Sequence, residues 1–210
     1  MPLPVGARCR IDIVTDDDMP VRVSYTFPTP GWLAWFGAYK DVEDGDDDQY
    51  VSVLIEDLCT INACKQQQPA DPPVGASVGD LAAAFSRLPP FEVSSPPMEV
   101  TTYGYSGVHV QIKAPDQMDG DDIRGVKGCQ LGELQNWILV GRYNSRSWAM
   151  SHPGDSADFW ILEVEGRGVV IAALATANAS KDLRAEQQAI LDSIVIEPPS
   201  PPKPRVDDSR

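Results

Sequence analysis

Alternation of polar and apolar residues is clearest in the last third of the chain. From Asp158 to Glu165, apolar side chains occupy every second position, which is the period of a strand with one buried face. The alternation resumes over 169–173, after Gly166-Arg167. A glycine at the first central position is typical of a two-residue type II′ hairpin. The pattern predicts two antiparallel strands joined by a tight turn.

Helical spacing follows this hairpin. Ser180 is a suitable N-cap, and Asp182 suits the positive end of the helix dipole. The prolines at 198 and 199 end regular structure. The apolar stripe of the predicted helix consists of Leu183, Ile190, Leu191 and Ile194.

Earlier segments predict further elements of both kinds. Strands are expected over 11–14, 21–27, 50–55, 108–112 and 134–140. A second helix is expected between Pro72 and Pro90, where Ser77 and Asp80 resemble a capping box. We therefore predict an α+β fold in which an antiparallel β-sheet packs against two helices. Residues 1–197 are expected to form one domain, and the proline-rich residues 198–210 a disordered tail.

Charge and composition exclude several classes of function. The chain has 210 residues, 42% of them hydrophobic, and a formal net charge of −14, so it repels nucleic acids and anionic lipids. No apolar run approaches the length of a membrane-spanning helix, and no phosphate-binding or dinucleotide motif occurs. The acidic runs around Gly45 and Gly120 do not fit the ligand spacing of a calcium loop. We expect no metal and no cofactor.

The cysteines bear on localisation. An even number of widely spaced cysteines fits two disulfides in an extracellular protein, with buried free thiols and a zinc site as alternatives. The first residues, MPLPVGARCRIDI, lack the apolar core of a secretory signal. We expect an extracellular or cell-surface protein whose signal or anchor is absent from this chain. The four cysteines are Cys9, Cys59, Cys64 and Cys129.

No catalytic constellation stands out. Ser106 in GYSG precedes a strand, whereas a nucleophile elbow requires a strand-to-helix turn. His109 falls on the polar face of its strand and is expected to be solvated. Ser151, His152 and Asp155 are too close together in one loop to form a triad. We expect no catalytic residue.

The tryptophans are the remaining candidates for binding. Trp32 and Trp35 lie in a glycine-rich segment, where loops often carry binding residues. They are candidates for the floor of a ligand or glycan pocket, and the alternative is that they plug one end of the sheet. Trp137 and Trp160 fall in strand patterns and are expected in the core.

Several segments resemble a family of secreted or membrane-anchored actinobacterial ectodomains that mostly carry no assigned function. They are PPVG with the helix after it, GYSG before a strand, GCQLGELQNW, and WILEVEGRGVVIAA with RAEQQAILDSI. The order of strands and helices is also similar to Mog1/PsbP-like lipoproteins. The resemblance to the ectodomain family places one cysteine after the third strand and one near GCQLGELQNW, which match Cys64 and Cys129, so we expect these two to pair. Cys9 and Cys59 are then an added pair, although four cysteines permit three pairings and the sequence does not choose among them. The resemblance also implies a leucine where this chain has Gln187, which we expect to be exposed or hydrogen-bonded.

These observations favour a noncatalytic extracellular domain: a sensor, a lipoprotein-like accessory protein, or a module that binds a protein or a small ligand. The alternative is a cell-envelope glycan hydrolase or glycan-binding protein that uses acidic loop residues with Trp32 and Trp35. Two carboxylates beside these rings in a concave pocket would favour the alternative. A third possibility is a structural module tethered to a partner through its proline-rich tail.

Overall fold

The computed structural model describes two helices and three β-sheets. The helices are α1 (Val78–Phe85) and α2 (Lys181–Asp192). The fold is α+β and mostly antiparallel, as the sequence predicts. The described residues are 4–13, 21–34, 37–42, 49–56, 58–59, 74–75, 77–88, 91–116, 138–139, 150 and 153–198.

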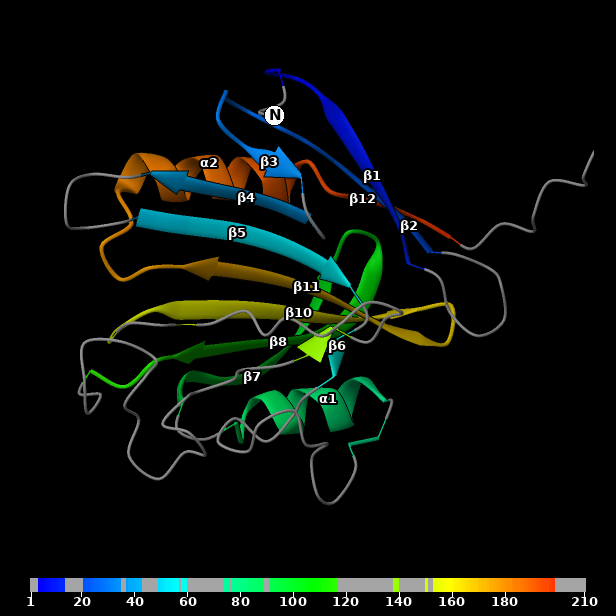
Figure 1. Cartoon of the computed structure of the whole chain (residues 1–210). Helices are drawn as coiled ribbons and strands as arrows, with labels where there is room; N and C mark the ends of the chain where they lie inside the picture. Colours follow the sequence, from blue (N-terminus) through cyan, green and yellow to red (C-terminus); the bar gives the residue numbers. More distant parts are fainter. Residues whose placement is uncertain are drawn as a thin grey trace, which may run out of the picture.

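The largest sheet has seven strands, and every neighbouring pair is antiparallel (Figure 1). The expected hairpin of β10 and β11 lies at its centre. In spatial order the strands are β3 (Leu33–Ala34), β4 (Gly37–Val42), β5 (Gln49–Glu56), β11 (Arg167–Ala175), β10 (Ser156–Val164), β8 (Tyr105–Lys113) and β7 (Glu92–Thr102).

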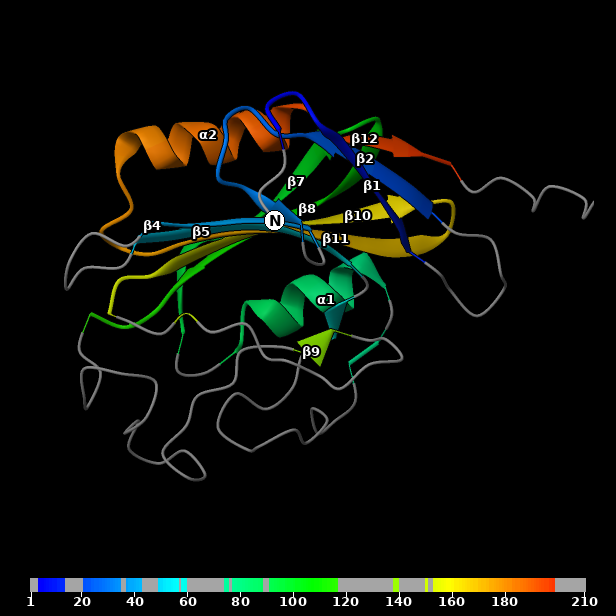
Figure 2. The ribbon, with the colours of Figure 1, turned by 45° about the horizontal axis from the view of Figure 1, so that its top comes forward.

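Two smaller sheets accompany it. The first consists of β1 (Arg8–Ile13), β2 (Val21–Thr26) and β12 (Val195–Glu197), and the second of β6 (Leu58–Cys59) and β9 (Ile138–Leu139). Figure 2 shows α2 and the three-stranded sheet on one side of the large sheet and α1 on the other. The two helices therefore cover opposite faces.

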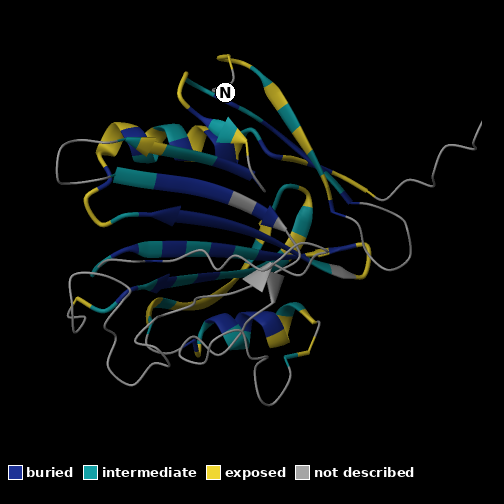
Figure 3. Ribbon diagram, in the orientation of Figure 1, coloured by how far each residue is buried: buried dark blue, intermediate teal, exposed yellow. Residues whose placement is uncertain are grey.

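Each face of the large sheet has its own hydrophobic core, and the dark strands of Figure 3 lie between the two cores. On the α1 side, Phe85 stacks on Phe159 with ring centroids 4.3 Å apart. The core on the α2 side includes Leu183 and Ile190 of the helix and Ile196 of β12. Because alternate residues of β10 and β11 point to opposite faces, these strands contribute to both cores.

Both helices begin as the sequence predicts. The hydroxyl of Ser77 accepts a hydrogen bond from the Asp80 amide, and that of Ser180 accepts one from the Leu183 amide, each at 3.1 Å. Gln187 is buried, and its Nε2 donates to the carbonyls of Ser52 (2.8 Å) and Leu174 (2.7 Å). The expected alternative of a hydrogen-bonded Gln187 is therefore confirmed.

The turn between β10 and β11 differs from the expectation by one residue. Val164 pairs with Arg167, so the central residues are Glu165 and Gly166, with φ angles of 50° and 81°. Positive φ at both central positions belongs to a type I′ turn, so the predicted type II′ turn at Gly166-Arg167 is wrong. The type I′ turn prevails because its twist matches that of the strands, although Glu165 adopts a left-handed conformation.

Strand β7 forms one edge of the large sheet. It contains Pro96 and Pro97, which are exposed, and its pairing with β8 shifts register between Ser95 and Met98. Proline has no amide hydrogen to donate and is confined to edge strands or bulges. The proline pair is thus compatible with the edge position and the shifted register of β7.

Candidate functional site

A group of polar and aromatic side chains occupies the α2-side face of β8 and β10. Val110 and Phe159 point into the core on the α1 side. Their neighbours along each strand must therefore point to the opposite face. This face carries His109 and Gln111 from β8 and Asp158 and Trp160 from β10, which together are called the His109 face below.

The strand register brings these side chains together in two adjacent rows. His109 is paired with Trp160, and Gln111 with Asp158. The Nε2 atom of His109 lies 2.8 Å from Oδ1 of Asp158, and Nε2 of Gln111 donates to the same oxygen at 3.0 Å. The His109 ring also stacks on the Trp160 indole, with centroids 5.0 Å apart and an interplanar angle of 24°. The imidazole is thus held on its edge by a carboxylate and on its face by an indole.

The His109 face is accessible to solvent. The side chains of His109 and Asp158 are 16% and 27% exposed, and Gln111 and Trp160 are half-buried. Met98 lies beside His109 on β7 and is 51% exposed. The face therefore combines fixed polar groups with apolar surface.

Lys113 borders the His109 face but contributes little net charge to it. Its ammonium group lies 3.0 Å from Asp116 and 3.6 Å from Glu92. The hydrogen bond to Asp116 raises the pKa of Lys113, and the charge of Glu92 acts in the same direction. The positive charge is therefore matched by neighbouring carboxylates.

His109 and Asp158 have the geometry of a histidine oriented by an acid. A hydrolytic dyad of this kind also needs a nucleophile within hydrogen-bond reach of the imidazole. Among the described residues, no serine, threonine or cysteine side chain is hydrogen-bonded to His109. The arrangement can bind and orient a ligand, and it lacks the nucleophile of a covalent mechanism within that part of the chain.

Trp32 lies in the core on the α2 side and is completely buried. Its Nε1 donates to Oε2 of Glu186 at 2.9 Å, and the same oxygen accepts from Lys40 at 2.7 Å and from the Thr29 hydroxyl. The indole fills space between α2 and the edge of the sheet near β4. Trp35 lies outside the described residues, so its predicted role in binding stays a prediction.

Burial and hydrogen bonding act in opposite directions on Glu186. Burial raises the pKa of its carboxyl group, but hydrogen bonds from Lys40, Thr29 and Trp32 together lower the pKa below its ordinary value. The carboxylate is therefore ionised in the folded protein near neutral pH and joins α2 to the β3–β4 end of the sheet.

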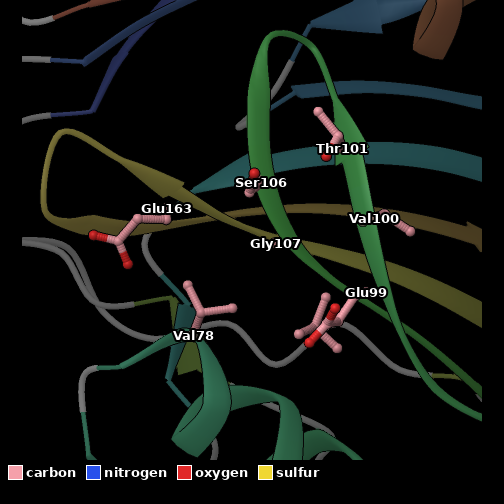
Figure 4. Close-up of a pocket in the computed structure, with 8 residues that line it drawn as sticks. Val78, Glu99, Val100, Thr101, Ser106, Gly107 and Glu163 are labelled. Atoms are coloured by element: carbon pink, nitrogen blue, oxygen red, sulfur yellow. The ribbon is translucent and has the colours of Figure 1, made fainter.

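An open pocket of about 600 Å³ lies at the tips of the β7–β8 and β10–β11 hairpins, beside the first turn of α1 (Figure 4). Glu99 and Glu163 line it from opposite sides, with Val78 between them, and both carboxylates are exposed. Trp32 belongs to the core on the other face of the sheet. The feature expected of a glycan hydrolase, paired carboxylates beside Trp32, is thus not formed by these residues.

The pairing of Cys9 with Cys59 is not formed. Cys9 has a free thiol, and burial raises its pKa despite a hydrogen bond with Tyr25. β1 lies on the α2 side of the large sheet, whereas β6, which contains Cys59, lies near α1 (Figures 1 and 2). Cys64 and Cys129 lie outside the described residues, so their pairing stays a prediction.

The other candidates considered from the sequence have structural positions. Asp155 is buried, and its Oδ1 accepts from the Ala177 amide at 3.0 Å. Ser106 is an exposed residue of β8, not part of a strand-to-helix turn. Ser151 and His152 lie outside the described residues. No group of three or more metal-ligating side chains occurs in the described part of the chain, and none of its helices is long and apolar enough to cross a membrane.

The fold supports the α+β class, and comparison with known proteins adds no family to that description. No protein-family model matches the chain. No curated protein matches it either.

Sequence reasoning recognised the polar face of β8 but not the site. It placed His109 among solvated residues and Trp160 in the core. Trp160 does pack against the core on the α2 side, but it is half-buried and also stacks on His109. The sequence signal for the site was a second polar residue two positions away on each strand, Gln111 beside His109 and Asp158 beside Trp160. The pairing register between these strands, which brings the groups together, was not readable from the sequence.

Proposed function

We propose that the protein is a noncatalytic binding domain and that the His109 face is its recognition surface. The observation that supports this function best is the double anchoring of His109 by Asp158 and Trp160 on an accessible part of a rigid sheet. Side chains held in place before a ligand arrives lose little conformational entropy on binding. The face is thus prepared for recognition.

Its position on the large sheet supports the same conclusion. β10 is a central strand, paired with β11 on one side and β8 on the other, and its opposite face is packed in the core on the α1 side. Binding groups built on strands are held more precisely than groups on loops. The absence of a hydroxyl or thiol bonded to His109 in the described residues favours binding over turnover.

The proposal includes an extracellular or cell-surface location, with a small ligand or a protein as the partner. It also includes a Mog1/PsbP-like arrangement of the fold. The supports are the resemblance of several segments to actinobacterial ectodomains, the α+β class with one middle and one C-terminal helix, and the cysteine content. With Cys9 free, three cysteines remain, and at most two of them can pair with each other. The chain therefore holds at most one internal disulfide.

A fragment screen tests the recognition surface directly. The isotope-labelled full chain is titrated with a library of small neutral polar and aromatic fragments while amide and side-chain NMR signals are recorded. We expect the shift changes to cluster at Gln111, Asp158 and Trp160. A screen whose hits cluster elsewhere would contradict the proposed surface.

A panel of chromogenic ester, phosphate and glycoside substrates tests the noncatalytic role. We expect no turnover above that of the His109→Ala variant. Turnover by the natural chain that this single substitution abolishes would refute the proposal, because it would make His109 a catalytic residue.

A further inference from the structure

We infer that the ligand class of the His109 face is a neutral carbohydrate, bound through its hydroxyl groups and one face of a sugar ring. This inference rests on the proposed function of the face and adds the chemistry of what it binds. It follows from the charge of the face, from its unused hydrogen-bonding atoms and from the apolar surfaces beside them.

Charge at the face disfavours an anionic ligand. Asp158 is at its centre, and Lys113, at its border, is matched by Asp116 and Glu92. The chain as a whole carries a net charge of −14. An anionic ligand would meet the Asp158 carboxylate, and the positive charge of Lys113 is already matched by its own carboxylate neighbours. A phosphorylated or acidic ligand is therefore repelled.

The polar atoms of the face have capacity left for a ligand. Both hydrogen bonds to Asp158 go to Oδ1, and within the described residues Asp158 Oδ2, Gln111 Oε1 and Trp160 Nε1 have no protein partner. None of these atoms is among the buried atoms without a partner, and the three residues that carry them are partly exposed. Two are acceptors and one is a donor. A hydroxyl group both donates and accepts, so adjacent hydroxyls of a sugar match this mixture.

The apolar surfaces lie next to these atoms. The Trp160 indole is half-buried in the same row as His109, and Met98 on the far side of His109 is 51% exposed. A sugar ring presents C–H groups on its faces and hydroxyls on its rim. An amphipathic aromatic residue with a polar tip is suited to that combination, because one ligand can contact its apolar body and its N–H together.

The experiment begins with an array of immobilised neutral, acidic and amino sugars, with a peptide array as the competing class. The full chain is applied to both, and hits are measured by titration in solution. The test variants are Asp158→Ala and Trp160→Leu. The matched control is Glu163→Gln, because Glu163 is also on β10 but lines the pocket on the opposite face. Circular dichroism and Tm establish that each variant is folded.

We expect binding to neutral sugars only, weakened about tenfold or more by either test variant and unchanged by the control. Acidic sugars as the preferred hits, or no sugar hit at all, would overturn the carbohydrate inference. Peptide hits that are lost in Trp160→Leu would also overturn it while leaving the proposed recognition surface intact. Sugar binding that both test variants retain would show that the His109 face is not the binding surface, so the proposed function would fail with the inference.

Discussion

Removal of the Glu186 carboxylate should destabilise the fold more than is usual for a residue outside the hydrophobic cores. Oε2 of Glu186 accepts hydrogen bonds from Trp32, Lys40 and Thr29. In the Glu186→Ala variant, the Trp32 Nε1 group loses this acceptor. Trp32 is completely buried, so water cannot readily replace the lost bond.

The expected loss can be worked from these contacts. A buried donor left without a partner costs about 1–3 kcal/mol. The Lys40–Glu186 pair, with side chains 16% and 22% exposed, contributes about 1 kcal/mol more. A total of about 3 kcal/mol corresponds to a Tm lower by about 6–12 °C for a domain of this size.

Urea denaturation, followed by circular dichroism, measures the free energy of unfolding of both proteins. The control is Gln188→Ala, which removes an exposed hydrogen bond to Asp192 on the same helix and should cost less than about 0.5 kcal/mol. Glu186→Gln should fall between the two, because an amide oxygen can still accept from Trp32. A loss below about 1 kcal/mol in Glu186→Ala would refute the reasoning that this carboxylate satisfies the buried indole.

Four other predictions concern different contacts. The folded-state pKa of Glu186 is lowered, so its contribution to stability is present above the ordinary carboxyl pKa of 4.5 and is lost as pH falls. The difference in free energy of unfolding between the natural chain and Glu186→Gln, measured by urea titration, should therefore shrink below that pH. Gly107→Ala should unfold at a clearly lower temperature in calorimetry, because a Cβ atom there would lie 2.1 Å from the Ile161 carbonyl oxygen. Gln187→Leu should lower the free energy of unfolding by about 1–2 kcal/mol in urea, because it leaves two strand carbonyls without their buried donor. Cys9 should react with a thiol reagent in unfolded, non-reduced protein, as mass spectrometry of the labelled peptide would show.

Two of these predictions have a matched control variant, and each has an outcome that would contradict it. For Gly107, the control is Gly79→Ala in α1, where a Cβ atom has space and alanine favours the helix by about 1 kcal/mol. Equal Tm values for the two glycine variants would contradict the steric argument. For Gln187, Gln188→Ala again serves. If Cys9 stays unlabelled in unfolded protein, it forms a disulfide and the prediction is wrong. If the difference in free energy of unfolding between the natural chain and Glu186→Gln does not change with pH, the lowered pKa of Glu186 is contradicted.

Elements with a strong local pattern could be predicted from the sequence. The β10–β11 hairpin and both helices were expected because alternation, helical spacing and the caps at Ser77 and Ser180 all act over a few residues. β4 was missed because a glycine-rich stretch has no clear alternation. It forms a strand through pairing with β5 and through the contact of Lys40 with Glu186.

Two further strands depend on tertiary context in the same way. β7 was missed because Pro96 and Pro97 argue against a strand, and only an edge position makes them acceptable. β12 has three residues and exists because Ile196 pairs with Val23 and is buried on the α2 side. Neither reason is visible in a local window of sequence.

The candidate site shows the same limit of sequence reasoning. The polarity of His109 and Asp158 was visible, but the residues are 49 positions apart. Their contact follows from the pairing of β8 with β10, which is set by the packing of the core on the α1 side. The prediction that Cys9 pairs with Cys59 was wrong for a similar reason, because such a pair depends on which side of the large sheet each cysteine lies.

The proline pair of β7 has a consequence for how other chains can approach the protein. An extended peptide that joins a sheet needs a continuous row of amide hydrogens and carbonyls along the border strand. Pro96 and Pro97 supply no amide hydrogens, and the shifted register beside them distorts the row. The middle of β7 therefore cannot pair with an added strand, and this disfavours edge-to-edge association of copies of the chain. Another chain can bind this part of the sheet only through side-chain contacts.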